Sequence, residues 1–73
     1  MNDFKVTATN DFEDRVLSEQ ADLSEKMQKL STFMYGKVFP TLPAVDQGLL
    51  MVQYRQMEAY SVTLSDRIER FNS

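Results

Sequence analysis

The chain has 73 residues, enough for one domain, and carries eight Lys and Arg against eleven Asp and Glu, a net charge of −3. It contains no Cys and no His, which excludes disulfides and the zinc sites that those residues build. Chains this small usually supplement a modest core with partner chains, so self-association is the expected source of extra burial. The scattered cations disfavour binding to duplex DNA or RNA, which relies on clustered Lys and Arg.

The sequence offers no membrane or secretion signal. Its first residues, Met1 to Lys5, lack the basic-then-apolar pattern of a signal peptide. The longest apolar stretch, Leu49 to Val52, is far too short to span a bilayer. Together with the absence of Cys, which fits a reducing compartment, this pattern leads us to expect a soluble cytoplasmic protein without a membrane partner.

The first predicted element is a helix over about 11–35. Residues 1–10 are polar and have no sustained period, so we expect a flexible lead-in. Asn10 and Glu13 have the spacing of a capping box, which predicts that the helix begins directly after Asn10. Gly36 predicts its end, because glycine readily adopts the left-handed conformation that terminates helices.

A connector over 36–42 leads to a second helix, predicted over about 43–71. Pro43 suits a first helical turn, since its missing N–H would be unpaired there. So short a connector makes the two helices antiparallel neighbours. Several apolar residues lie off the stripe that would face the other helix, and such surplus commonly marks contact with partners. These are Leu17, Met51, Val52, Tyr54 and Val62. The expected fold is therefore an all-α, antiparallel two-helix hairpin that assembles as a homo-oligomeric helical bundle.

A ladder of polar residues interrupts the apolar helical pattern. Glu19 and Lys26 on the first helix, and Gln53, Tyr60 and Arg67 on the second, recur every seven residues. Seven residues return nearly to the same face of a helix, so each set lines one edge. A hairpin symmetric about its connector would place Glu19 level with Tyr60 and Lys26 level with Gln53. The same symmetry places Arg67 level with Phe12.

The ladder has two interpretations, and the residues leave both open. Polar residues beside a helical seam commonly form interhelical ion pairs that select register and oligomer state. Alternatively, they line a ligand pocket between subunits, where Lys and Arg neutralise phosphate and Tyr60 or Tyr54 stacks on a base. Gln53 or Glu19 would then read the hydrogen-bonding edge of that base. The candidate ligand-binding residues are Arg15, Glu19, Lys26, Gln53, Tyr60 and Arg67.

Catalysis has no recognisable support in the sequence. The chain contains no His or Cys, no glycine-rich phosphate loop and no cluster with metal-ligand spacing. A Lys, Tyr or carboxylate can act as an acid or base when its pKa is tuned, but no specific arrangement of them is present. We expect a protein that is not an enzyme, with no catalytic residue, metal site or cofactor.

A combined pattern of residues runs from Phe12 to Phe71: Arg15-Val16, Glu19, Leu23, Lys26, Lys29-Leu30, Phe33, Phe39, Leu42-Pro43, Leu49-Leu50, Gln53, Met57, Tyr60, Leu64 and Arg67-Ile68. This pattern resembles a family of small proteins of tailed bacteriophages and prophages, including a member in crAss-like phage. The resemblance implies a helical hairpin of phage origin, acting in the host bacterial cytoplasm. A looser likeness, in size and architecture, is to the hairpin domains of phage anti-CBASS and anti-Thoeris proteins, oligomers that bind nucleotide second messengers of bacterial immunity.

These resemblances imply a functional hypothesis. The chain would be a phage-encoded homo-oligomer that sequesters a cyclic nucleotide or an ADP-ribose derivative without cleaving it, and so blocks an anti-phage defence. The alternative is a protein-binding inhibitor or adaptor, in which the apolar face of the second helix docks in a groove of a host protein.

Overall fold

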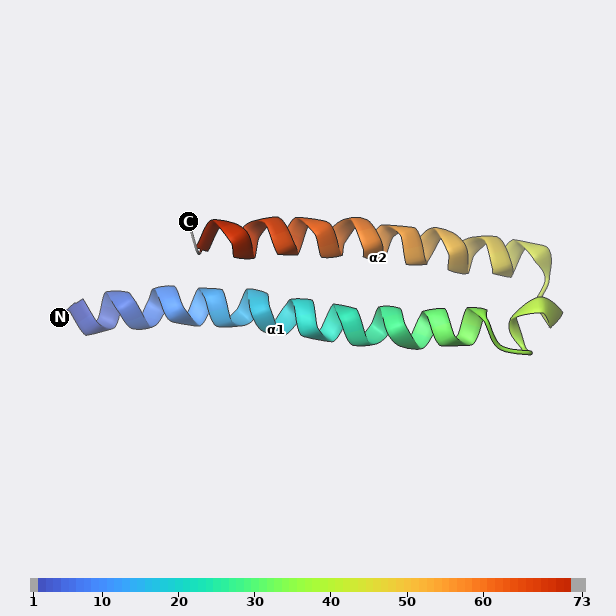
Figure 1. The fold of residues 1–73 in the computed structure, drawn as a ribbon, viewed down its shortest axis with the longest axis horizontal. Coiled ribbons are helices and arrows are strands. Elements are labelled where there is room, and N and C mark those ends of the chain that lie inside the picture. The colour runs from blue at the N-terminus through green and yellow to red at the C-terminus, as the bar shows by residue number, and fades with distance from the viewer. Residues whose placement is uncertain (1, 72–73) are drawn as a thin grey trace.

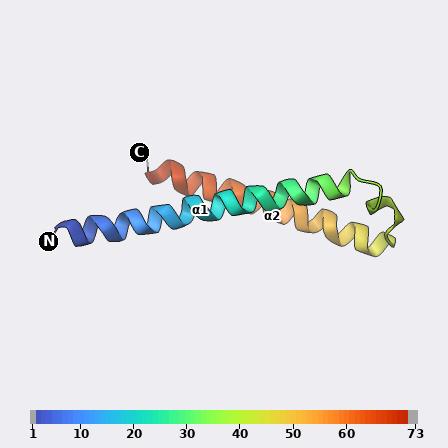
Figure 2. The ribbon, with the colours of Figure 1, turned by 90° about the horizontal axis from the view of Figure 1, so that it is seen from below.

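The protein is a hairpin of two long antiparallel helices (Figure 1). The computed structural model describes the backbone of residues 2–71 and the side chains of residues 11–71. Helix α1 spans Asn2–Met34, a 3-10 turn η1 spans Phe39–Thr41, and helix α2 spans Ala44–Phe71. The helices cross at a shallow angle (Figure 2), and the molecule measures 59 × 16 × 16 Å. Within residues 2–71 there is no strand, and the predicted all-α hairpin is confirmed.

Helix α1 begins nine residues earlier than the capping-box pattern predicts. It starts at Asn2 and passes through Asn10 without interruption, so the backbone of the predicted lead-in is helical over 2–10. The cause is that no Gly or Pro occurs before Gly36, and nothing breaks the succession of N–H to i−4 carbonyl bonds. As a result α1 extends beyond the C-terminal end of α2 (Figure 1).

Gly36 ends α1 by a different means from the predicted left-handed conformation. The described backbone of residues 2–71 contains no glycine with positive φ. Instead, a Cβ at Gly36 would lie 3.3 Å from the Phe33 carbonyl oxygen and 3.5 Å from that of Thr32. The Gly36 N–H donates to the Phe33 carbonyl at 3.0 Å. Glycine is suited to this position because the chain passes very close to the last helical carbonyls.

The connector is held to the start of α2 by one side chain. Gln47 Nε2 donates to the Leu42 carbonyl at 2.8 Å and to the Pro40 carbonyl at 3.3 Å. The Gln47 N–H also donates to the Pro43 carbonyl at 3.0 Å, the first helical bond of α2. Pro43 therefore lies immediately before α2, where it needs no N–H of its own.

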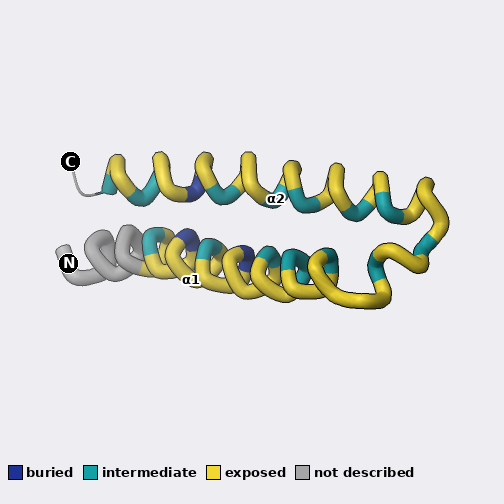
Figure 3. Tube along the Cα trace, turned by 45° about the vertical axis from the view of Figure 1, so that its right-hand side comes forward, coloured by how far each residue is buried: buried dark blue, intermediate teal, exposed yellow. Residues whose placement is uncertain are grey.

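Few side chains are buried between the helices. Among residues 11–71, only Val16, Leu23 and Leu64 are buried (Figure 3), and Leu64 is 0% exposed. Packed against them are Met27, Met57, Ile68 and Phe71. The Cα radius of gyration is 17.1 Å, whereas a compact domain of this length would have about 11 Å. A single hairpin thus has a thin core.

The surface is correspondingly large. The chain exposes 5945 Å², whereas a compact monomer of its mass exposes about 4,650 Å². The surplus of about 1,300 Å² exceeds the ~800 Å² that each partner buries in a standard protein interface. Over the described residues, neither helix contains an apolar run that could cross a membrane.

Candidate functional site

One long edge of the hairpin joins the two helices through polar and aromatic side chains. The Tyr60 hydroxyl, on α2, donates a hydrogen bond to Glu19 Oε2, on α1. One heptad further along α2, the Arg67 guanidinium lies over the Phe12 ring, with Cζ 5.4 Å from the ring centroid. We call this side of the hairpin, with Phe12, Glu19, Tyr60 and Arg67, the polar edge. Both contacts join residues that the hairpin symmetry placed level with each other, so that part of the prediction is confirmed.

Both aromatic residues of the polar edge are partly exposed to solvent. Tyr60 is 41% exposed and Phe12 is 50% exposed, while Arg67 is half-buried. Phe12 also meets Phe71 edge to face, with the ring centroids 5.9 Å apart. A cation held over one ring, beside a second accessible ring, is an arrangement that can stack a flat group and hold a neighbouring anion.

The charge around Tyr60 changes the acidity of its hydroxyl. The pKa of Tyr60 is raised above its ordinary value, mainly because the hydroxyl donates to Glu19. Partial burial and the negative charge of Glu19 raise this pKa further, and the positive charge of Arg67 lowers it in part. Tyr60 therefore remains a neutral hydrogen-bond donor throughout the pH range in which proteins normally function.

Replacing Glu19 with glutamine tests this linkage. We expect Glu19→Gln to lower the pKa of Tyr60 toward the ordinary tyrosine value, since the carboxylate is both the acceptor and the repelling charge. In the unmodified protein, stability should fall as pH rises above the ordinary tyrosine range, because the unfolded chain ionises first. Ultraviolet titration of tyrosinate measures the pKa, with Tyr60→Phe identifying the signal, and thermal unfolding at a series of pH values measures the stability. Identical titration curves for the unmodified protein and Glu19→Gln would contradict the linkage.

The other predicted site residues do not join this cluster in a single chain. Arg15 lies on an exposed turn of α1 and pairs with Asp11, its Nη2 3.6 Å from Asp11 Oδ2. Lys26 and Gln53 are both exposed and, over residues 11–71, make no hydrogen bond or ion pair. The predicted level pairing of Lys26 with Gln53 therefore produces no contact. The structure brings together Glu19, Tyr60 and Arg67.

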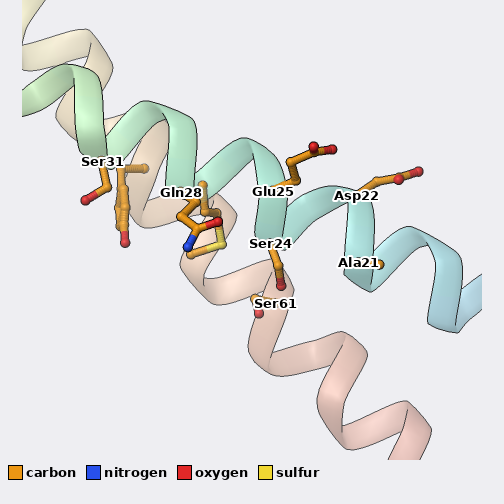
Figure 4. A pocket seen from close by; sticks show the side chains of 9 residues that line it. Ala21, Asp22, Ser24, Glu25, Gln28, Ser31 and Ser61 are labelled. Atoms are coloured by element: carbon orange, nitrogen blue, oxygen red, sulfur yellow. The ribbon is translucent and has the colours of Figure 1, made fainter.

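A groove that the sequence analysis missed runs along the opposite edge. Gln20 Nε2 donates to Ser65 Oγ at 2.8 Å across the helices. Next to this bond, Ser24 of α1 points toward Ser61 of α2, whereas Asp22 and Glu25 point away from α2 (Figure 4). This part of the groove has a volume of about 750 Å³. Its lining residues are Ala21, Asp22, Ser24, Glu25, Met27, Gln28, Ser31, Tyr54 and Ser61.

The groove continues toward the connector as a second hollow of about 450 Å³. The two hollows share Ser31 and Tyr54, and the second adds Tyr35, Phe39 and Glu58 among its lining residues. Neither hollow is lined by a Lys or Arg. Tyr54 therefore lies in the groove and not on the polar edge. The residues that line the groove with it include no Lys or Arg that could hold a phosphate.

Comparison with known proteins places most of the hairpin in one family. Residues 10–70 match the family model described as Sequestin. The chain belongs to the Sequestin family. It is 37% identical over 60 residues to a protein of Enterobacteria phage T4, described as an uncharacterized 7.5 kDa protein in the denB-rIIB intergenic region. The aligned part covers 82% of this chain and 94% of that relative. No solved structure matches the chain.

The Sequestin match confirms the predicted relationship to a family of small phage proteins. The matched residues, 10–70, include both partners of each polar-edge contact, as well as Arg15, Lys26 and Gln53. It also includes the residues of the missed groove. The N-terminal turns of α1, before residue 10, lie outside it.

A sequence signal for the missed groove was available. Gln20, Ser24 and Ser31 of this Sequestin-family chain follow one another by four and seven residues, and Ser61 and Ser65 by four. This is the same helical spacing that revealed the polar ladder. Over residues 11–71 no three acidic side chains gather into a metal-binding group, so neither edge carries a metal site of that kind.

Proposed function

We propose that this Sequestin-family hairpin sequesters a small nucleotide signal of bacterial anti-phage immunity, as a homo-oligomer in the host cytoplasm, without converting it. The ligand class is a cyclic nucleotide or an ADP-ribose derivative. The family name, Sequestin, is compatible with sequestration, and the relative is encoded by a phage. The observation that carries the proposal is the polar edge, where a guanidinium, a neutral phenol and a carboxylate adjoin exposed aromatic rings.

Each residue of the edge has a role suited to such a ligand. Arg67 offers a fork of N–H donors to a phosphate, held in position by its contact with the Phe12 ring. The exposed ring of Tyr60 stacks on a base. Glu19 accepts hydrogen bonds from the N–H groups of that base.

The remaining candidate residues act at a junction between copies. Lys26 and Gln53 are exposed and make no bond within the described part of one chain, so they are available to a ligand or a second copy. Arg15 lies one helical turn from Glu19 and adds a further cation for phosphate. The surplus surface of the single hairpin supports assembly, because association would cover it.

Ligand binding is tested with purified protein and a panel of cyclic nucleotides and ADP-ribose cyclic isomers. A ligand at one hundred times its dissociation constant stabilises the folded state by about 2.7 kcal/mol, which raises Tm by roughly 10–20 °C. Heat-released ligand, analysed by chromatography, should have unchanged mass and retention. No shift with any member of the panel would reject the proposal, and a converted product would show an enzyme.

The second candidate, a protein-binding adaptor, is favoured by the apolar residues that α2 exposes near the connector. Val45 is 73% exposed, Leu49 is 63% exposed and Val52 is 51% exposed. An adaptor would place this face in a groove of a host protein. Affinity purification from infected cells separates the candidates. An adaptor recovers one host protein in equal amount, and a sequestering protein instead recovers a nucleotide that survives denaturation of the complex.

A further inference from the structure

Gly48 lies inside α2, four residues after the helix begins, and no feature of the single chain accounts for it. Glycine weakens a helix relative to alanine, because it loses more backbone freedom on folding. The Gly48 backbone needs no special conformation, as φ is not positive. A Cβ built at Gly48 would meet no atom within 4 Å, so no close contact within the chain requires its absence.

The residues around Gly48 form an apolar surface. Val45, Leu49 and Val52 follow at intervals of four and three residues, so they share one side of α2 with Gly48. We call these four residues the α2 strip. Its three side chains are each more than half exposed, and none of the four residues is charged.

We propose that the α2 strip is the contact between two copies of this chain, with two α2 helices crossing at Gly48. A glycine at a crossing point lets two helix backbones approach closely, as small residues do elsewhere in helix packing. Around a two-fold axis near Gly48, Val45 of one copy meets Val52 of the other. Leu49 of each copy then fills the space beside the glycine of its partner.

The geometry favours a second copy as the occupant of the α2 strip. A two-fold contact requires a surface that is complementary to itself. The strip meets this requirement, because a valine stands three residues before Gly48 and another stands four residues after it. The surplus surface of about 1,300 Å² belongs to the whole hairpin, and association of two copies through the strip would cover part of it. This inference rests on the self-association contained in the proposed function and identifies the surface that performs it.

Gly48→Ala distinguishes a strip that faces solvent from a strip at which two α2 helices cross, because the two cases predict opposite results. If the strip faces solvent, alanine improves the helix and raises Tm by several degrees without changing assembly. If the strip is the crossing point, the added methyl groups separate the helices and weaken dimerisation by about tenfold or more. Sedimentation velocity over a dilution series measures the dissociation constant. Gln28→Ala, on the groove edge, is the matched control and should leave that constant unchanged.

Disulfide trapping locates the contact independently of stability. The chain has no Cys of its own, so a single introduced cysteine reports a single position. Leu49→Cys should form a covalent dimer within minutes of oxidation, because its copies lie beside the axis and cysteine is smaller than the leucine it replaces, whereas Gln28→Cys should not. An oligomer that crosslinks at neither position, or only through Gln28→Cys, overturns this inference and leaves ligand sequestration standing. A chain that remains monomeric at high micromolar concentration overturns both this inference and the proposed assembly.

Discussion

Leu64→Ala should destabilise the hairpin by about 2–5 kcal/mol, the usual cost of deleting a buried leucine side chain. Leu64 is 0% exposed and forms one buried cluster with Val16 of α1 and Leu23 of α1. These three are the buried side chains among residues 11–71. No further buried side chain is therefore available in this part of the chain to fill the cavity that the substitution leaves. Native stabilities of small domains are only about 5–15 kcal/mol, so the loss is a large fraction of the total.

Thermal unfolding followed by circular dichroism measures this loss. A domain of this size shifts its Tm by about 4–8 °C for each kcal/mol, so we expect a decrease of roughly 10 °C or more. Leu17→Ala is the matched control, since it removes the same atoms from a side chain that is 47% exposed. It should lower Tm by far less. Equal losses at the two positions would show that the inner face of the hairpin is not the core.

Arg67→Met should weaken ligand binding by about 10- to 100-fold, the range for losing a hydrogen bond to a charged group. Methionine keeps an unbranched apolar stem against the Phe12 ring, so the packing of the two helices changes little. The substitution removes only the positive charge and the N–H donors of the guanidinium. Isothermal titration with the nucleotide that gives the largest Tm increase measures the affinity.

Arg55→Met provides the control for this second prediction. Arg55 is an exposed arginine of the same helix and takes no part in the polar-edge contacts. Its replacement changes net charge equally and should leave the affinity within about twofold. If Arg67→Met instead leaves the affinity unchanged and dissociates the oligomer, the ladder consists of structural ion pairs.

The heptad pattern predicted the cross-helix pairing well. Residues seven apart stay on one side of a helix, and a short connector makes the helices antiparallel, so symmetry about the connector pairs the positions. The contacts of Glu19 with Tyr60 and of Arg67 with Phe12 follow directly. The pairing of Lys26 with Gln53 did not follow, because two exposed flexible side chains at one level gain little by meeting.

Local signals at the helix ends were less reliable. Asn10 and Glu13 have the spacing of a cap, but a cap is needed only where a helix begins, and α1 continues through both. Gly36 was correctly placed at the end of α1, yet its role depends on the distance to the Phe33 carbonyl, which no sequence pattern contains. The groove with Ser24 and Ser61 was overlooked because serines on a helix usually face solvent.

The short connector, to which Gln47 is hydrogen-bonded, affects how fast the protein folds. Helical hairpins draw their contacts from segments joined by a short link, and proteins with such low contact order fold in microseconds to milliseconds. Synthesis on the ribosome proceeds at about 5–20 residues per second, far more slowly. Each newly made molecule should therefore be folded very soon after its release from the ribosome, and encounter with other molecules would limit how soon it acts.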